Sequence, residues 1–121
     1  MAALGRYAAA VMGNDQELVD ALLAAAGRSG EPLWQLPLWA ELDRRLPSPV
    51  ADVVCNDTKA GGGAIVAGLF LRRFAKGLTW AHIDCTGPAF IPEHLATPAR
   101  PPGGSGYGVR TLLAWLEHRT R

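Results

Sequence analysis

His82 and Asp84 are the residues whose types and spacing best suit metal chemistry. They lie two positions apart in the apolar segment 78–84, so on a strand both side chains would point to the same face of a sheet. Imidazole and carboxylate groups both bind Zn²⁺. The sequence offers no third ligand of comparable strength, and a His–Asp pair on an apolar strand commonly satisfies itself or orders a loop. We therefore expect a structural role for this pair.

Two further patterns also have structural interpretations. Asp15 and Glu17 stand at the start of a helical pattern, where the helix dipole and the unpaired N–H groups stabilise carboxylates. The run Gly61-Gly62-Gly63 precedes an apolar helix and could hold a phosphate on backbone N–H groups. The lysine and hydroxyl residue that complete a P-loop are missing after it, which favours tight packing at the start of the helix.

The sequence also lacks a complete set of residues for nucleophilic catalysis. Ser105 follows two glycines, but the nucleophile-elbow pattern G-x-S-x-G requires glycine where the chain has Tyr107. Cys55 and Cys85 have no cationic partner beside them in the sequence, apart from His82 near Cys85. A reactive thiol needs an electropositive environment, so we expect both cysteines to be small buried residues.

The elements that must position these residues alternate between helix and strand patterns. Asn14 is expected to cap an amphipathic helix that Gly27 ends, with Glu17 completing a capping box. Further helices are expected over residues 38–46, 64–76 and 109–118, extended segments or strands over 31–37, 51–58 and 78–84, and a strand or helix over 2–12. Residues 88–108 form a turn-rich loop. This alternation predicts an α/β fold in which helices pack on a small, incomplete mixed β-sheet.

Large apolar residues are expected to face a single core. One face of the last helix carries Val109, Leu112, Leu113 and Leu116. The four tryptophans, Trp34, Trp39, Trp80 and Trp115, lie in apolar segments. We interpret them as core or interface residues and not as a platform for stacking bases.

Composition limits the class of protein. A chain of 121 residues forms at most one domain, and 49% apolar with 19% charged residues excludes a disordered tail. The net charge of +1 gives no basis for binding nucleic acid or anionic lipid. The sequence contains neither a run of about 20 apolar residues nor a typical signal peptide, and its two cysteines do not form a disulfide scaffold. A cytoplasmic protein is expected.

Six segments occur in a fixed order along the chain: VMGND, LWQLPL, SPVADV, GGGAIVAGLFLRRF, TWAHIDCTGPAF and GYGVRTLLAWL. Together they resemble the C-terminal part of the catalytic domain of the leucine aminopeptidase (cytosol aminopeptidase) family, from about residue 3 to residue 116. The most specific segments lie at 63–74 and 80–88. The resemblance predicts that residues 1–121 form the C-terminal segment of a three-layer α/β/α catalytic domain.

The resemblance implies an exopeptidase that removes N-terminal amino acids from peptides. In that family two divalent ions, zinc or manganese, activate the scissile carbonyl and supply the attacking hydroxide. Members are cytoplasmic hexamers built from trimers. The implied partners are therefore a peptide substrate and further copies of the chain, without nucleic acid or membrane.

The metal-binding and catalytic side chains of the family lie before the matched region, partly in an Asn-Thr-Asp-Ala-Glu-Gly-Arg block that these 121 residues lack. The resemblance therefore implies no metal ligand and no catalytic residue in this chain. It assigns Thr86 and Ala89 to the wall of the pocket for the N-terminal side chain of the substrate, and places Asp57 near the next subsite. Because the family more often has alanine where Thr86 stands, a slightly more polar pocket wall is expected.

Two interpretations follow. In the first, the chain is a fragment of a metalloaminopeptidase that is inactive alone, is marginally stable, and either self-associates or needs the missing N-terminal part. Unpaired strand edges would make such a fragment prone to aggregation. In the second, the chain is a non-catalytic interaction module that docks on aminopeptidase subunits or another partner through an apolar face. A third interpretation, an active enzyme built on His82 and Asp84, needs ligands that the sequence does not supply.

Overall fold

A three-stranded mixed sheet forms the centre of the protein. The computed structural model describes residues 4–55 and 61–119, and its sheet contains β1 (Ala9–Gly13), β2 (Leu33–Gln35) and β3 (Ala81–Asp84) in the order β2-β1-β3. β1 pairs in parallel with β2 and antiparallel with β3. The central strand is therefore the one that the long apolar run near the N-terminus forms.

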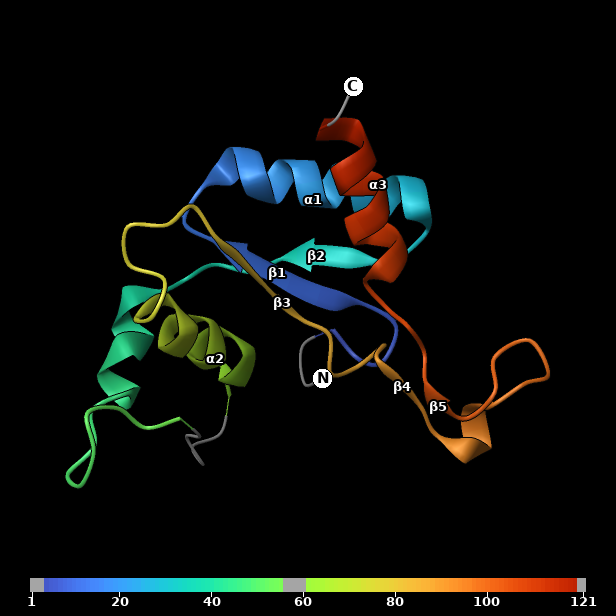
Figure 1. Cartoon of the computed structure of the whole chain (residues 1–121). Helices are drawn as coiled ribbons and strands as arrows, with labels where there is room; N and C mark the ends of the chain where they lie inside the picture. The colour runs from blue at the N-terminus through green and yellow to red at the C-terminus, as the bar shows by residue number, and fades with distance from the viewer. Residues whose placement is uncertain (1–3, 56–60, 120–121) are drawn as a thin grey trace.

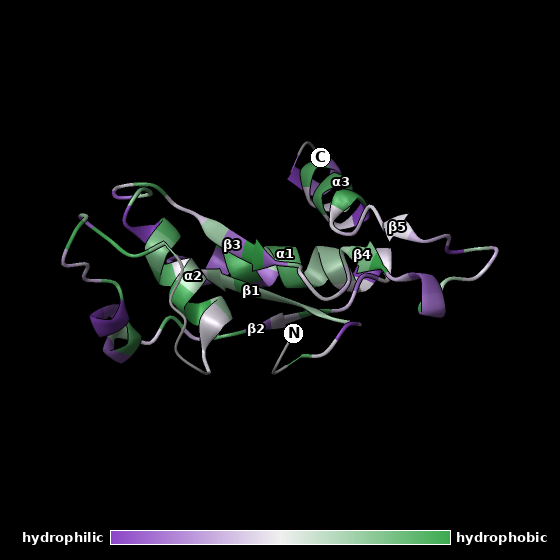
Figure 2. Cartoon of the chain, turned by 90° about the horizontal axis from the view of Figure 1, so that it is seen from below, coloured by the Kyte–Doolittle hydropathy of each residue, from purple (hydrophilic) through white to green (hydrophobic). Residues whose placement is uncertain are grey.

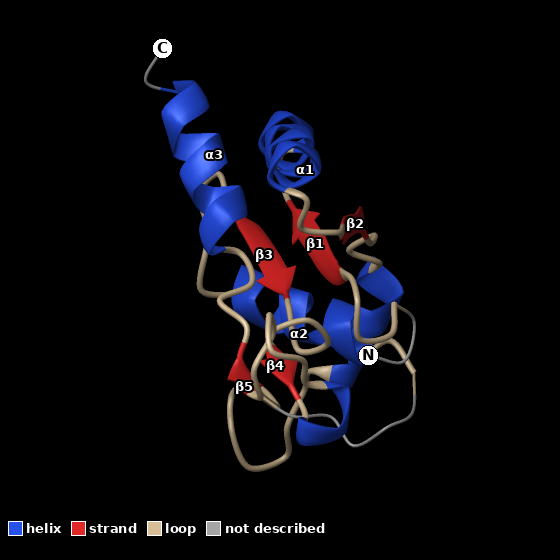
Figure 3. Ribbon diagram, turned by 90° about the vertical axis from the view of Figure 1, so that its right-hand side faces the viewer, coloured by secondary structure: helices blue, strands red, loops and turns tan. Residues whose placement is uncertain are grey.

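Helices cover both faces of this sheet (Figure 1). On one face lie α1 (Gln16–Ser29) and α3 (Val109–Arg119), which pack against each other. On the other face lie α2 (Gly63–Arg72) and the 3₁₀ helix η1 (Ala40–Arg45), as the side view also shows (Figure 3). The prediction of an α/β fold with helices on a small mixed sheet is thus confirmed.

Successive side chains of β1 enter the two helical layers, because side chains alternate along a strand. Val11 packs with Val19 and Leu22 of α1, and it is fully buried. Met12, which is also fully buried, lies against Gly68 of α2; a Cβ added there would lie only 3.1 Å from the Met12 Sδ atom. A strand that is buried on both faces requires an unbroken apolar sequence, which residues 8–12 provide.

Helix α1 begins and ends at residues other than those predicted. Asp15, not Asn14, is the N-cap, and its Oδ1 atom accepts a hydrogen bond of 2.8 Å from the Leu18 N–H. Gly30, with φ 69°, provides the left-handed C-cap, whereas Gly27 lies inside the helix. A glycine ends a helix only where the backbone needs a positive φ, and packing against α3 continues the helix past Gly27.

Asn14 has a tertiary role in place of the capping role. Its Nδ2 atom donates to the Leu78 carbonyl at 2.7 Å, and its Oδ1 atom accepts from the Trp80 N–H at 3.0 Å. The Asn14 N–H also donates to the Trp80 carbonyl. These three bonds fix the end of β1 to the chain that enters β3.

The turn-rich loop between β3 and α3 forms an arm that extends away from the sheet (Figure 1). It contains a two-stranded hairpin of β4 (Phe90–Ile91) and β5 (Gly103–Gly104), with the short 3₁₀ helix η2 (Glu93–Leu95) between them. Ile91 is buried at its base.

Several segment predictions were wrong in detail. Residues 51–55 form bends and no strand, and residues 56–58 lie outside the described part of the chain. Helix α2 ends at Arg72 and turns follow it up to Gly77, while β3 is shorter than predicted and only half-buried. A strand at the edge of the described sheet has a neighbour on one side only, which explains its exposure.

Side-chain burial also differs from the prediction. Trp34 is 67% exposed and Trp39 61% exposed, so two of the four tryptophans are outside the core. Cys55 is exposed and Cys85 half-buried, and both thiols are free. The apolar face of α3 is exposed as well: Val109, Leu112, Leu113 and Leu116 all point to solvent. Helix α3 contacts the core through Trp115 and Thr111 instead, and hydrophobic segments alternate with hydrophilic ones along its ribbon (Figure 2).

Candidate functional site

The turn that follows β3 carries the two described residues assigned to a substrate pocket. Thr86 is exposed and Ala89 is half-buried. The Asp84 Oδ1 atom accepts from the Thr86 N–H at 3.3 Å and from its hydroxyl at 3.1 Å, and the Ala89 N–H donates to the Cys85 carbonyl at 2.9 Å. These bonds fix the turn and engage the Thr86 hydroxyl, so that the Thr86 methyl group and the Ala89 side chain are its apolar side-chain groups.

This turn packs directly against the turn at residues 4–7 that leads into β1. The antiparallel pairing of Ala10 with Asp84 brings the start of β1 and the end of β3 to the same edge. Gly87 is buried there, and a Cβ at this position would lie 3.2 Å from the Arg6 Cα atom and closer still to the Gly5 carbonyl. Only glycine allows the two turns to approach this closely.

A cavity of about 360 Å³ opens beside the same turn. Asp84 and Gly87 line it from the turn, and Gly62, Gly63 and Ile65 line it from the start of α2. Its other described lining residues are Leu4, Ala8, Ala10, Leu36 and Ala64, so most of the surface is apolar. Thr86 and Ala89 are beside this cavity in sequence but are not among the described residues that line it. Asp57, the third predicted pocket residue, lies outside the described residues.

His82 and Asp84 lie two positions apart on β3, as predicted. Burial lowers the pKa of His82 below its ordinary value of 6.5, and the nearby Asp84 charge opposes that shift. Asp84 is engaged by Thr86. Within residues 4–55 and 61–119, no group of three His, Cys, Asp or Glu side chains is arranged to hold a metal ion. The donor set in the described structure therefore does not fit the divalent ions that the family resemblance implies.

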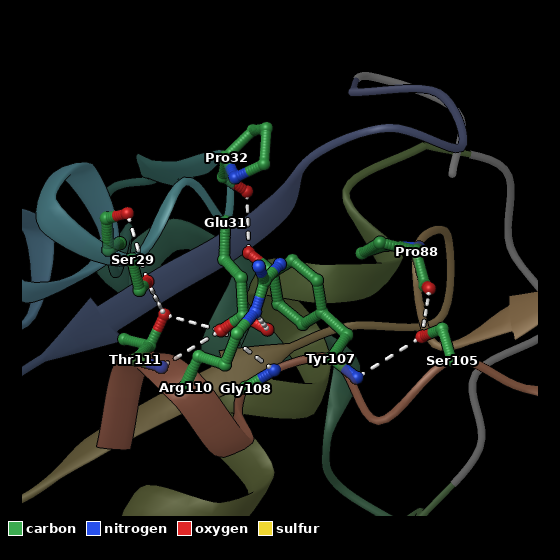
Figure 4. Close-up of polar contacts among 10 residues, drawn as sticks. Ser29, Glu31, Pro32, Pro88, Ser105, Tyr107, Gly108, Arg110 and Thr111 are labelled. Atoms are coloured by element: carbon green, nitrogen blue, oxygen red, sulfur yellow. Dashed lines mark hydrogen bonds and ion pairs between the residues drawn. The ribbon is translucent and has the colours of Figure 1, made fainter. Parts of the chain in front are cut away.

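Glu31 is the most buried acidic residue of the described part of the chain, and no sequence pattern identified it. It is only 4% exposed, and it lies between β2 and the start of α3 (Figure 4). Its Oε2 atom accepts from the Gly108 N–H at 3.1 Å, from the Thr111 N–H at 2.9 Å and from the Thr111 hydroxyl at 2.7 Å. The Arg110 guanidinium lies 3.4 Å from Oε1.

Burial by itself would raise the pKa of Glu31, but the hydrogen bonds from Thr111, Gly108 and Arg110 outweigh it and the pKa lies below 4.5. The carboxylate thus caps the N-terminal end of α3, where negative charge is favoured. The partners of Glu31 lie 77 to 80 residues away in sequence, so no local pattern could have identified this contact.

Ser105 has a structural role too, in agreement with the rejected nucleophile elbow. Its hydroxyl donates to the Pro88 carbonyl at 2.6 Å and accepts from the Tyr107 N–H at 3.1 Å (Figure 4). The Tyr107 hydroxyl in turn donates to the Pro32 carbonyl. The Ser105 bond to Pro88 joins the two ends of the arm, and the Tyr107 bond to Pro32 attaches the arm to the body of the protein.

No described helix is both long and apolar enough to cross a membrane.

The sequence matches known proteins over nearly its whole length. The model of the cytosol aminopeptidase family, catalytic domain, matches residues 1–113. A probable cytosol aminopeptidase of Geobacter sp. (strain M21) is 44% identical over 117 residues, which cover 97% of this chain and 23% of the relative. A probable cytosol aminopeptidase of Streptomyces coelicolor is 46% identical over 118 residues, which cover 97% and 22%.

Solved structures give the same result. The bottromycin maturation enzyme BotP in complex with Mn is 39% identical, with a TM-score of 0.87 over 99% of this chain and 26% of the BotP chain. A mutant of tomato leucine aminopeptidase is 33% identical, with a TM-score of 0.83 over 98% of this chain and 22% of that chain. The chain therefore spans about a quarter of the length of the proteins that it matches.

Proposed function

The chain belongs to the cytosol aminopeptidase family, and from this premise we propose that it forms the C-terminal part of the catalytic domain of a leucyl aminopeptidase. The observation that carries the proposal is the family match over residues 1–113, together with the agreement in fold with BotP and the tomato enzyme. In this role residues 1–121 supply one wall of the substrate pocket, and the remaining three quarters of the enzyme supply the chemistry.

The turn after β3 is the proposed contact with substrate. Thr86 and Ala89 present the side chains that would face the N-terminal residue of a peptide, and Gly87 keeps the turn close to the start of β1. Because the bonds to Asp84 fix the Thr86 hydroxyl, mainly its methyl group remains for contact with substrate. We place Asp57 near the following subsite on the family resemblance alone.

Metal chemistry belongs to the complete enzyme in this proposal. The BotP structure contains Mn, which supports a divalent ion, manganese or zinc, as the cofactor of the assembled protein. The described part of this chain offers no group of three ligands for such an ion. We therefore propose that the chain alone does not hydrolyse peptides, and that it acts in the cytoplasm on peptides only within a complete, oligomeric aminopeptidase.

Fragment complementation tests this proposal. The 121-residue chain is expressed alone, and also together with the part of the Streptomyces coelicolor relative that precedes the matched region. Hydrolysis of leucine p-nitroanilide is measured with and without Mn²⁺ or Zn²⁺, and circular dichroism verifies folding. We expect turnover only from the co-expressed pair. The corresponding C-terminal segment of the relative is the positive control for complementation.

Two results would contradict the proposal. Chelator-sensitive turnover by the folded chain alone would indicate a metal site within the chain, with His82 and Asp84 as candidate ligands. Failure of this chain to restore activity, when the segment of the relative does restore it, would show that the chain does not supply this part of an aminopeptidase.

The role of Thr86 has its own test in the active pair. Thr86→Ala is expected to increase kcat/KM for phenylalanine over leucine at the substrate N-terminus about two- to fivefold, because loss of the Thr86 methyl group widens the pocket wall. Thr79→Ala, an exposed threonine at the opposite end of β3, is the matched control and should leave this ratio unchanged. An unchanged ratio in Thr86→Ala would remove Thr86 from the pocket.

An interaction module is the second candidate, and the exposed apolar face of α3 favours it. Leu112, Leu113 and Leu116 are all exposed, at spacings that place them on one side of the helix. Such a face suits docking on an aminopeptidase subunit or another partner. Detection of a stable complex between the chain and an intact, already active family enzyme would favour this function over that of a catalytic-domain segment.

A further inference from the structure

A cleft at the base of the arm concentrates positive charge. It has a volume of about 590 Å³, within the range of small-molecule sites. Its walls come from the turn before β1, from the segment between α1 and β2, from the arm and from the start of α3. The described residues that line it are Arg6, Tyr7, Gly30, Glu31, Pro32, Pro88, Ile91, Ala99, Arg100, Pro101, Gly104, Ser105, Tyr107 and Arg110. We refer to this cavity as the arginine cleft.

Three guanidinium groups and a single carboxylate line the arginine cleft, which gives it a net charge of +2. The carboxylate is that of Glu31, whose Oε2 atom already accepts three hydrogen bonds from Gly108 and Thr111. Its remaining charge is partly neutralised by Arg110 at 3.4 Å. The cleft therefore presents a surplus of positive charge whose only described counter-charge is engaged elsewhere.

Arg6 and Arg100 are the two cations of the cleft with free donors. Neither guanidinium forms an ion pair or a side-chain hydrogen bond with the residues that the structure describes. Both also line a smaller adjoining cavity of about 190 Å³ that Phe90 and Leu95 close with apolar surface. Two planar donor groups thus face one space from different segments of the chain.

The floor of the cleft is fixed by hydrogen bonds. Ser105 joins the Pro88 carbonyl to the Tyr107 N–H, and the Tyr107 hydroxyl reaches the Pro32 carbonyl (Figure 4). Burial and the nearby Glu31 charge raise the pKa of Tyr107 above 10.0, so its hydroxyl stays protonated and adds no negative charge. A site with a fixed floor needs less ordering when a ligand binds.

We propose that the arginine cleft binds a small multivalent oxyanion, a phosphate or a polycarboxylate group, between Arg6 and Arg100. Guanidinium groups match such anions because their paired N–H donors meet two oxygens at once. Arg110 contributes its charge from the rim while it remains paired with Glu31. This site shares Pro88 with the pocket-wall turn, but neither Thr86 nor Ala89 is among the described residues that line it. Anion binding there does not depend on aminopeptidase activity.

Calorimetric titration of the 121-residue chain with inorganic phosphate and with citrate, at constant ionic strength, tests the proposal. We expect one anion per chain. The dissociation constant should rise about tenfold in Arg6→Gln and in Arg100→Gln, since each removes a charge-assisted contact. Lys76→Gln is the control, because Lys76 is exposed at the opposite end of β3 and its loss changes net charge equally. Tighter binding of phosphate would identify phosphate groups as the ligand class, and tighter binding of citrate would identify carboxylates.

Two results would overturn the site. The first is the absence of saturable binding of either anion to the folded chain. The second is equal weakening in Lys76→Gln and in the two arginine variants, which would indicate a non-specific effect of net charge. Amide chemical shifts provide a second readout: phosphate should move the signals of Gly104, Ser105 and Tyr107 in the wild-type chain, and Arg100→Gln should need about tenfold more phosphate for the same movement.

Discussion

The Glu31 carboxylate accepts both the N–H and the hydroxyl of Thr111, at 2.9 and 2.7 Å, across 80 residues of sequence. The Thr111 hydroxyl also lies 3.0 Å from the Ser29 hydroxyl. One buried carboxylate thereby joins the end of α1, the segment before β2 and the first turn of α3. This contact and the packing of Trp115 against the core hold the last helix in place, because its leucine face is exposed.

Glu31→Gln is expected to lower the free energy of unfolding by about 2–3 kcal/mol, since it removes a charged acceptor from a buried cap. The lowered pKa predicts a pH dependence as well: the contribution of Glu31 is complete above pH 4.5 and disappears as pH falls through the lower pKa of the folded state. Urea unfolding between pH 3 and pH 7 measures both effects. Equal stability of variant and wild type at pH 7 would contradict the assigned role.

Gly87→Ala is expected to destabilise the protein by about 1–3 kcal/mol, because the added Cβ would collide with the backbone of the turn at residues 4–7. Gly27→Ala is the matched control. A Cβ at Gly27 meets nothing within 4 Å, and alanine in a helix interior should stabilise by about 0.5–1 kcal/mol. The melting temperature should therefore fall in Gly87→Ala and rise in Gly27→Ala. A rise in both variants would argue against the close approach of the two turns.

Asn14→Ala is expected to cost about 1 kcal/mol, since both side-chain bonds to the chain entering β3 are lost. Gln35→Ala serves for comparison because it removes only an exposed amide pair with Gln16, and we expect less than about 0.5 kcal/mol for it. Hydrogen exchange of the β3 amides should accelerate in the Asn14 variant alone. Unchanged β3 protection would show that Asn14 does not fix this strand.

His82 should titrate below 6.5 in the folded chain, because burial disfavours the imidazolium. The unfolded chain then binds the proton first, so stability falls as pH decreases from 6.5 through the folded pKa. Asp84→Asn should lower the pKa of His82 further, since it removes the charge that opposes the shift. NMR titration of the His82 ring measures both, and a higher His82 pKa in the asparagine variant would contradict the explanation.

Leu113→Lys is expected to reduce self-association of the chain, because Leu113 is 55% exposed in the middle of the apolar face of α3. Sedimentation velocity at several concentrations measures the effect. Leu78→Lys, another exposed leucine outside this helix, is the control and should change association much less. A wild-type chain that stays monomeric at all concentrations would remove the basis for this prediction.

Local sequence patterns located most of the elements but not their exact ends. The Asn14-Asp15 pair was correctly placed at the start of α1, yet only the structure shows that Asp15 caps the helix while Asn14 bonds to the approach to β3. Both side chains suit a cap, and the contact that separates them spans more than 60 residues. Similarly, Gly27 and Gly30 are both glycines that could end the helix, and only the structure shows that Gly30 takes the positive φ.

The turn that carries the proposed pocket residues Thr86 and Ala89 was placed after β3 by the sequence, and their contact with substrate stays a prediction. The strand and turn around Asp84, Thr86 and Ala89 were found because they form a contiguous motif, and the structure shows how Asp84 orders the turn. Glu31 and Arg100 could not be found in this way. Their importance depends on groups that approach from other segments of the chain, and a single charged residue in an extended or loop segment is normally just solvated.

The sequence by itself determined the family and the α/β class, because these depend on ordered motifs and on the alternation of helix and strand patterns. It left the apolar run over residues 2–12 open as a strand or a helix, and the structure shows that this run forms the central strand β1. Only the tertiary structure decided that Leu112, Leu113 and Leu116 remain exposed while Thr111 is buried. Periodicity shows that a helix has an apolar face, but it does not show which face meets a neighbour. The buried carboxylate of Glu31 keeps the Thr111 side of α3 facing the body of the protein, since an ionised group held away from water needs its hydrogen-bond donors.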